Sequence, residues 1–249
     1  MARLDNVPLN TPAAPELLLA GSSWRLKDGL NLYSSPHSNG LATQAWSGRQ
    51  LRLLDQPPYK GRRRAELEED GYRGWLDPQD LLGQASSCSP YRPVLLNATS
   101  IEQRMGAVLT FAQAAASQAN VYLWGGCLGP NYDCSGLMQR AFASAGIWIP
   151  RDAYQQERFC MQLAFSPTEL QMLKPGDLIF FGSPQRCTHV GLHLGGGRYL
   201  HSSGQEHGRG GIGIDSLSPR DSHPVASHYR RDLRSAGRVQ RCHDGSHLP

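Results

Sequence analysis

Cys134 stands in the segment YDCSGLMQRAFASAG, residues 132–146, between an acid and a small hydroxyl residue. Apolar residues after it recur with helical spacing, which predicts a helix capped by Asp133, closed at Gly146 and followed by Pro150. In the first turn of a helix, the unpaired N–H groups and the helix dipole favour the thiolate and lower the thiol pKa. These features predict a nucleophile, and a thiol that only packs in the core is the equally weighted alternative.

Two histidines lie downstream, at the ends of short segments typical of strands. His189 opens HVGLHLG, His201 closes RYLH, and GGG between them predicts a tight turn. A hairpin would bring the two imidazoles together near one end, with His189 as the general base and His201 orienting its ring. His193 competes for the first role, because it shares a strand face with His189. The two would be about 13 Å apart on a strand, so a metal site between them is not expected.

Composition is that of an ordinary globular chain of 249 residues, with 39% apolar residues, 18% charged residues and a formal charge of +4. The basic run KGRRR, residues 60–64, is followed closely by ELEED, so a nucleic-acid partner is not expected. We identify neither an export signal nor an apolar stretch long enough to cross a membrane. The expectation is a cytoplasmic protein with no membrane association and no obligatory protein partner.

The six cysteines are scattered, and the sequence contains no C-x-x-C pair. In a reducing compartment they are expected to be thiols, and a structural zinc site is not expected. No cofactor is expected either.

The pattern along the chain predicts two domains. Residues 1–20 are Pro-rich and are expected to form a flexible lead-in, and short β-like segments over 21–82 predict a small closed barrel. Residues 83–94 resemble a linker. An α+β domain is expected over 95–235, followed by a tail over 236–249.

Helical spacing in the second domain recurs before the cysteine, in SIEQRMGAVLTFAQAAASQ, where Ser100 is the expected N-cap. After LKPG the pattern changes to strands: DLIFFG, HVGLHLG, RYLHSS and GIGIDSL. From about Ser227 the chain holds one possible last strand and then a polar end.

Residues from about Val121 to Ser203 resemble an NlpC/P60 cysteine peptidase domain. The resemblance rests on YLWGG, DCSGLMQRAFASAGIWIPRDAYQQ, LKPGDLIFFG and THVGLHLGGGRYLHSS, in the order in which the family has them. The N-terminal half resembles a bacterial SH3-like domain. Together these resemblances imply an α+β protein in which a small SH3-like β-barrel precedes a papain-like domain, with helices packed on an antiparallel sheet.

The resemblance implies hydrolysis of the amide bond between D-γ-glutamate and a diamino acid in peptidoglycan peptides. It assigns Cys134 as the nucleophile, His189 as the base and His201 as the third, orienting residue. The backbone N–H of Cys134 is the first candidate for the oxyanion donor.

The subgroup with SH3-like domains implies further residues that bind substrate. Asp133 and Ser135 match positions that hold the free amine of the peptide, and Tyr122 matches an aromatic residue of the site. Tyr72, in EEDGYRGWL, is the best match for a tyrosine that closes the pocket. Asp133 also has a structural interpretation as the helix N-cap, and both roles are compatible.

The expected function is therefore that of a cytoplasmic endopeptidase that recycles peptides such as L-Ala-γ-D-Glu-diamino acid. One alternative is a wall-remodelling hydrolase acting on intact peptidoglycan, and another is a non-catalytic SH3-like binding module. Related acyltransferases that act on lipids place the histidine before the cysteine, which is the opposite order. The sequence leaves open the identity of the diamino acid, the oligomeric state and any role of Cys127 and Cys187.

Overall fold

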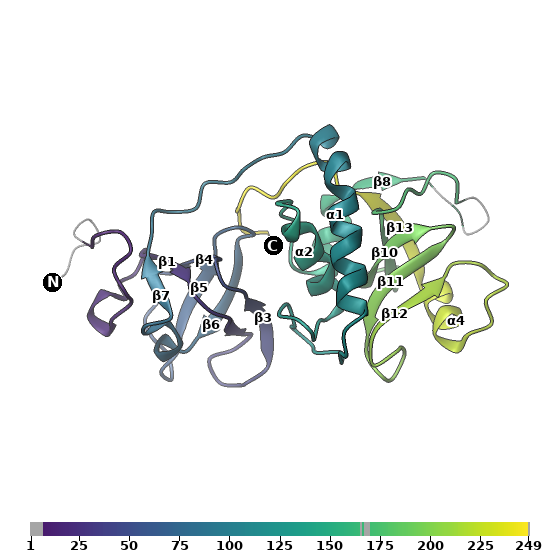
Figure 1. The fold of residues 1–249 in the computed structure, drawn as a ribbon. Helices are drawn as coiled ribbons and strands as arrows, with labels where there is room; N and C mark the ends of the chain where they lie inside the picture. Colours follow the sequence, from purple (N-terminus) through teal and green to yellow (C-terminus); the bar gives the residue numbers. More distant parts are fainter. Residues whose placement is uncertain (1–6, 165, 167–169, 249) are drawn as a thin grey trace. The chain divides into compact units, whose positions relative to one another are not determined.

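The computed structural model describes residues 7–164, 166 and 170–248, and it divides the chain into two compact units. The N-terminal unit comprises Met1–Val94 and Asp244–Pro249, and the C-terminal unit comprises Leu95–His243. Figure 1 shows a strand-rich first unit and a second unit in which helices pack against a sheet. The predicted α+β class is confirmed.

The N-terminal unit is a seven-stranded antiparallel sheet in the order β3-β2-β6-β5-β4-β1-β7. Alternating side chains from its strands enclose a core that includes Trp24, Leu32 and Leu51, each no more than 1% exposed. The strands are β1 (Ser23–Leu26), β2 (Leu30–Tyr33), β3 (Leu41–Ala45), β4 (Gln50–Leu53), β5 (Arg63–Leu67), β6 (Tyr72–Leu76) and β7 (Ala85–Ser87).

Two predicted boundaries of this unit are wrong. The expected flexible lead-in, residues 1–20, contains a described part that is integrated into the fold, because Ala13 and Leu18 are buried in the core. The short 3-10 helix Pro15–Leu17 lies between them. The expected linker, residues 83–94, begins with β7, which pairs with β1. A Ser-rich composition concealed that strand, because three residues are too few to show a period.

The C-terminal unit contains a six-stranded antiparallel sheet in the order β12-β11-β10-β9-β13-β8. The four predicted strands are present as β9 to β12. The strands are β8 (Met161–Leu163), β9 (Leu178–Gly182), β10 (Cys187–Gly195), β11 (Arg198–Ser203), β12 (Gly211–Ser216) and β13 (Leu233–Arg238). The helices are α1 (Ala98–Ala116), α2 (Cys134–Ser144), α3 (Ala153–Phe159) and α4 (Pro224–Arg231).

Helices cover both faces of this sheet. One core contains Leu178, Phe180 and Val190 together with the buried faces of α1 and α2. A smaller core on the other face contains Phe181 and Tyr199 with Tyr229 of α4. Figure 1 shows α1 and α2 on one side of the strands and α4 on the other. No helix in the described parts of the chain is long and apolar enough to span a membrane.

Helix caps decide where the first two helices begin. α1 begins before the expected cap, because the side chain of Asn97 accepts a hydrogen bond from the N–H of Ser100. Ser100 is therefore inside the helix rather than its N-cap. α2 begins as predicted, with Asp133 accepting a hydrogen bond from the N–H of Gly136. This cap places Cys134 at the first helical position.

The expected tail, residues 236–249, is not a separate segment. β13 continues to Arg238 and pairs with β9 on one side and β8 on the other, so it lies inside the sheet. The last residues, Asp244–Pro249, are grouped with the N-terminal unit, where Nδ1 of His247 lies 2.9 Å from the carbonyl oxygen of Gly71. The prediction of a separate tail is therefore wrong over the described residues 236–248.

Candidate active site

Cys134 is buried at the N-terminus of α2, with 7% of its surface exposed. α2 packs against β10, and the backbone N–H groups of Val190 and Ser135 both face the thiol. Val190 directly follows His189 in β10, so the thiol lies beside the strand that carries the expected base.

The pKa of Cys134 is raised to about 12, mainly by burial and then by the carboxylate of Asp133. The N–H groups of Val190 and Ser135 and the guanidinium of Arg151 oppose the rise without cancelling it. The expected lowering of this pKa by the helix terminus is therefore wrong. Burial and the neighbouring carboxylate destabilise the thiolate by more than the helix dipole stabilises it.

His189 and His201 meet across the hairpin formed by β10 and β11. Nε2 of His189 lies 2.7 Å from Nδ1 of His201, and their ring centroids are 5.0 Å apart. Gly191 leaves the room for this contact, since a Cβ there would lie 2.8 Å from Cδ2 of Tyr199 and 3.4 Å from Cβ of His201. Because Nε2 of His189 is engaged, Nδ1 is the ring nitrogen left to act on a thiol.

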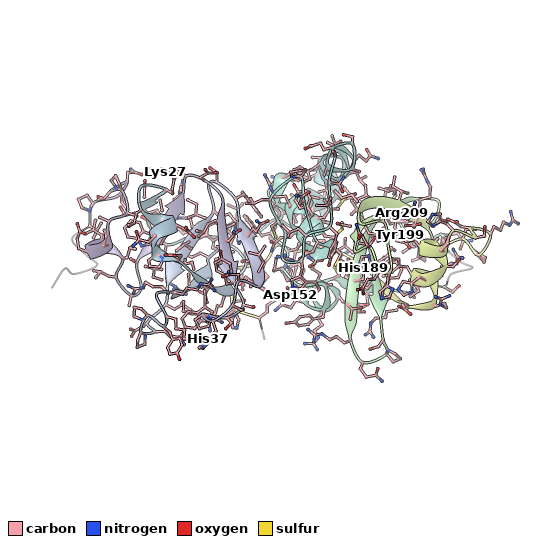
Figure 2. The ribbon with its side chains drawn as sticks, turned by 90° about the horizontal axis from the view of Figure 1, so that it is seen from below. Lys27, His37, Asp152, His189, Tyr199 and Arg209 are labelled. Atoms are coloured by element: carbon pink, nitrogen blue, oxygen red, sulfur yellow. The ribbon has the colours of Figure 1, made fainter. Side chains whose placement is uncertain are left out.

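Asp215 extends this pair, and no local sequence pattern predicted its role. Its Oδ2 lies 2.9 Å from Nε2 of His201, and both side chains are fully buried. Arg209 donates to the same carboxylate, from Nη2 to Oδ1 at 2.7 Å and from Nε to Oδ2 at 3.2 Å. Figure 2 shows Arg209 and Tyr199 on the same side of the unit as α4.

Tyr229 of α4 covers both histidine rings and was also missed. Its ring stacks on His189 at 4.3 Å between centroids, with an interplanar angle of 23°, and meets His201 edge-on at 4.9 Å. Its hydroxyl is hydrogen-bonded to Ser203. The tyrosine therefore restricts the His189 ring and shields it from water.

Both histidines are held neutral. Burial lowers the pKa of His189 well below its ordinary value, and the charges of His201 and His228 act in the same direction against Asp215. Burial also lowers the pKa of His201, more than Asp215 raises it. With a protonated thiol and a neutral imidazole at rest, the arrangement favours general-base catalysis over a preformed ion pair.

This resting state predicts the acid side of the pH profile. We expect kcat/KM to stay on its plateau below pH 6.5, the ordinary pKa of histidine, because a base with a lowered pKa is still unprotonated there. Initial rates at subsaturating substrate across the acid range measure this. An acid limb centred at or above 6.5 would contradict it.

Asp133 takes part in a closed network beside the thiol. Its carboxylate accepts hydrogen bonds from the N–H groups of Gly125 and Gly136, at 2.8 and 2.6 Å. Arg151 approaches it in a bidentate manner, at 2.7 and 3.1 Å, and also donates to Oγ of Ser135 at 2.9 Å. Ser135 in turn donates to Asp133 at 3.4 Å. Arg151 was not identified from the sequence, and it neutralises the charge of Asp133.

Tyr122 lies near Cys134 and Asp133. Burial raises its pKa, and the charges of Cys134 and Asp133 add to the rise, which shows that both are near its hydroxyl. Tyr72, the remaining expected site residue, is at the start of β6 in the N-terminal unit. Its place in the pocket stays a prediction.

His193 is a core residue with both ring nitrogens engaged. Nδ1 lies 3.0 Å from the carbonyl oxygen of Lys174, and Nε2 accepts from the N–H of Gly197 at 3.2 Å. Cys187 donates to the carbonyl oxygen of His189 at 3.4 Å, and Cys127 packs against the first turn of α2 at Gly136. All six cysteines lie in the described parts of the chain, and none of them forms a disulfide there.

Comparison with protein families matches two parts of the chain. Residues 119–231 match the NlpC/P60 family, and residues 32–81 match the bacterial dipeptidyl-peptidase Sh3 domain. The first match contains Cys134, His189, His201 and Asp215. It ends with α4, so it also includes Tyr229.

Curated relatives match over part of their length. A γ-D-glutamyl-L-lysine dipeptidyl-peptidase of Bacillus subtilis is 38% identical over 110 residues, which are 43% of this chain and 36% of that protein. The bifunctional muramidase/DL-endopeptidase CwlT of the same organism is 32% identical over 132 residues, 51% of this chain and 35% of that protein. The chain thus spans about a third of the length of these two relatives.

A solved structure supports the fold. The crystal structure of an NlpC/P60 family protein from Bacillus cereus aligns with a TM-score of 0.64 and 17% identity, over 88% of this chain and the whole of that one. At this identity the likeness supports the architecture alone.

Proposed function

Residues 119–231 belong to the NlpC/P60 family, and we propose that this protein is a cysteine peptidase that hydrolyses the γ-D-glutamyl–diamino acid bond of peptidoglycan-derived peptides. The observation that carries the proposal is the buried Cys134 beside β10, together with the 2.7 Å contact between His189 and His201. The match of the N-terminal unit to a dipeptidyl-peptidase Sh3 domain supports this substrate class.

Acylation begins with proton transfer from the thiol. Nδ1 of His189 takes the proton of Cys134 as Sγ bonds to the carbonyl carbon of the γ-D-glutamyl group. The carbonyl oxygen becomes an oxyanion, for which the N–H of Cys134 at the N-terminus of α2 is the candidate donor. The tetrahedral intermediate then collapses. The C–N bond breaks, the departing amine of the diamino acid takes the proton from His189, and a thioester remains on Cys134.

Deacylation repeats these steps with water. His189 removes a proton from the attacking water, and the hydroxyl oxygen bonds to the thioester carbon. When the C–S bond breaks, Sγ of Cys134 recovers the proton from His189. The products are the free diamino acid and the dipeptide L-Ala-D-Glu with a free γ-carboxylate, and the enzyme returns to a neutral thiol and a neutral imidazole.

The amine end of the peptide is the basis for the proposed specificity. Asp133, Ser135 and Tyr122 lie together beside the nucleophile, where they would meet the N-terminal L-Ala that precedes the γ-D-glutamyl group. Asp133 already accepts hydrogen bonds from five donors, so an ammonium would share it with Arg151. One hydrogen bond to a charged group is worth about 1.5–3 kcal/mol, so we expect at least about tenfold preference for the free amine.

A direct assay tests the proposed function. The purified protein is incubated with L-Ala-γ-D-Glu-meso-diaminopimelate, with the lysine analogue and with the N-acetylated form of each, and the products are quantified by liquid chromatography and mass spectrometry. We expect release of L-Ala-D-Glu and free diamino acid, faster from the free amines. Equal rates for free and acetylated peptides would favour wall remodelling, and no cleavage of any peptide would overturn the proposal.

Recycling of released wall peptides in the cytoplasm is part of the proposal, as a prediction from the sequence. A strain that lacks the gene is expected to accumulate L-Ala-γ-D-Glu-diamino acid in its cytosolic fraction. Accumulation confined to the medium or the wall would contradict this part alone.

A further inference from the structure

Asp215 is a fully buried carboxylate at the end of the histidine pair. Its Oδ2 lies 2.9 Å from Nε2 of His201, whose Nδ1 lies 2.7 Å from Nε2 of His189. The hydrogen-bonded chain thus runs from Asp215 through His201 to His189, the expected base for Cys134. The hydrogen bonds of Asp215 therefore reach His189 only through the His201 ring.

Charged and titratable neighbours determine the state of Asp215. Arg209 donates to both of its oxygens, and Nδ1 of His223 lies 3.8 Å from Oδ1. Tyr199, on the adjacent strand, lies close enough for Asp215 to raise its pKa. Burial acts to raise the pKa of Asp215, but the hydrogen bonds and charges of His201 and Arg209 lower it to about 2. The carboxylate is therefore ionised at neutral pH.

An ionised carboxylate accepts hydrogen bonds and cannot donate one. Nε2 of His201 must then carry the hydrogen in the 2.9 Å contact. In a neutral imidazole the other nitrogen is an acceptor, so Nδ1 of His201 accepts from Nε2–H of His189. The same rule leaves Nδ1 of His189 without a hydrogen.

We propose that Asp215, held by Arg209, is a positioning residue that sets the tautomer of both histidines and so leaves Nδ1 of His189 as the base for Cys134. When Nδ1 of His189 takes the thiol proton, its Nε2–H keeps donating to His201. The hydrogen bond between His201 and Asp215 does not change. The role of His189 as base rests on the proposed function, whereas the tautomers of the two rings do not depend on any substrate.

Asparagine at position 215 would reverse the pattern. Its amide has one donor end and one acceptor end. Arg209 donates to Oδ1 at 2.7 Å and more weakly to Oδ2 at 3.2 Å, so we expect the amide oxygen at the Oδ1 position and the NH2 group facing His201. With the NH2 group facing His201, Nε2 of His201 must accept. Its hydrogen moves to Nδ1, and Nδ1 of His189 becomes protonated. The nitrogen that should receive the thiol proton is then blocked.

Nitrogen-15 NMR of the imidazole rings reads the tautomers without any substrate. Signals of His189 and His201 are assigned from single histidine substitutions. In the wild-type protein at neutral pH, we expect the hydrogen on Nε2 in both rings, and in Asp215→Asn on Nδ1. A wild-type protein with the hydrogen on Nδ1 of His189, or an unchanged pattern in a folded Asp215→Asn variant, would overturn the proposal.

Reactivity of Cys134 provides the second readout. Its alkylation by iodoacetamide is followed by peptide mass spectrometry, because the chain has five other cysteines. General-base assistance typically accelerates a reaction 10²–10⁴-fold, so we expect Asp215→Asn to slow alkylation about 100-fold at neutral pH. The alkylation rate of the variant should recover at high pH, where the thiol ionises without a base. Asp215→Glu should restore part of the rate, and Glu206→Gln, an exposed carboxylate on the loop of Arg209, should leave it unchanged.

A structural role alone predicts a different result. If Asp215 only stabilised the fold, Asp215→Asn would lower the thermal midpoint but keep the pH profile of alkylation, and this outcome overturns the proposal. If Asp215→Asn does not fold, the wild-type tautomers decide the question alone. Because alkylation needs no peptide, a protein with normal alkylation that cleaves no peptide would overturn the proposed function and leave this inference standing.

Discussion

Cys134→Ala is expected to lower kcat for cleavage of L-Ala-γ-D-Glu-meso-diaminopimelate to the background, a loss on the order of 10⁶-fold. The thiol provides the only bond between enzyme and acyl group in the proposed mechanism, so no intermediate can form without it. The loss should be in kcat, and peptide binding measured by calorimetry should change little. Product formation at saturating substrate gives the rate.

The matched control is Cys88→Ala, at a half-buried cysteine of the N-terminal unit. It should retain the wild-type rate, which separates loss of the nucleophile from loss of any thiol. If Cys134→Ala kept more than about a hundredth of the wild-type kcat, the acyl-enzyme mechanism would be wrong.

Arg151→Met is expected to destabilise the C-terminal unit by about 3–5 kcal/mol, the usual cost of removing one partner of a buried ion pair. Arg151 is 1% exposed in its side chain and lies 2.7 Å from Oδ2 of Asp133. Without it, Asp133 keeps its charge in a buried position beside Cys134. For a unit of this size the loss corresponds to a decrease in Tm of about 10 °C. Calorimetric unfolding measures it.

Two further variants distinguish the cause. Asp133→Asn combined with Arg151→Met should recover most of the lost stability, because asparagine still caps α2 and leaves no buried charge. Arg198→Met removes an exposed arginine and should change Tm by no more than about 1 °C. A double variant as unstable as Arg151→Met would show that the guanidinium contributes packing rather than charge.

Site residues that are marked by a local sequence pattern, such as a helix cap or a glycine-rich turn, could be predicted from the sequence. Asp133 is the helix cap that the sequence indicated, and it places Cys134 at the first helical position. The glycine-rich turn between His189 and His201 predicted a hairpin, and the rings meet across it. Their catalytic roles stay predictions until the variants are measured.

Residues joined only by tertiary structure were missed. Asp215 lies in GIGIDSL, where a polar residue in an alternating strand is usually on the solvent side. Its register opposite Tyr199 places it inside, and that pairing is not visible in either segment alone. Tyr229 belongs to a helix so polar that its pattern resembled a tail. Arg151 precedes α3, without a local pattern that links it to Asp133.

Strand β13 illustrates the same limit for the fold. LRSAGR has no alternation of apolar and polar residues, and the segment was therefore expected to be partly tail. Its position inside the sheet is determined by β9 and β8, which lie about 50 and 70 residues earlier in the chain. Burial between two other strands provides the stability that its own sequence does not predict.

Trapping the acyl-enzyme is the most direct test of the central claim that Cys134 attacks the γ-D-glutamyl carbonyl. The wild-type protein is mixed with L-Ala-γ-D-Glu-meso-diaminopimelate, quenched in acid within one turnover and mapped by peptide mass spectrometry. We predict an L-Ala-γ-D-Glu adduct on Cys134 that hydroxylamine removes, as expected for a thioester. The time course must be dense enough to resolve a single turnover. Turnover without this adduct would then contradict the account, and so would an adduct on another residue.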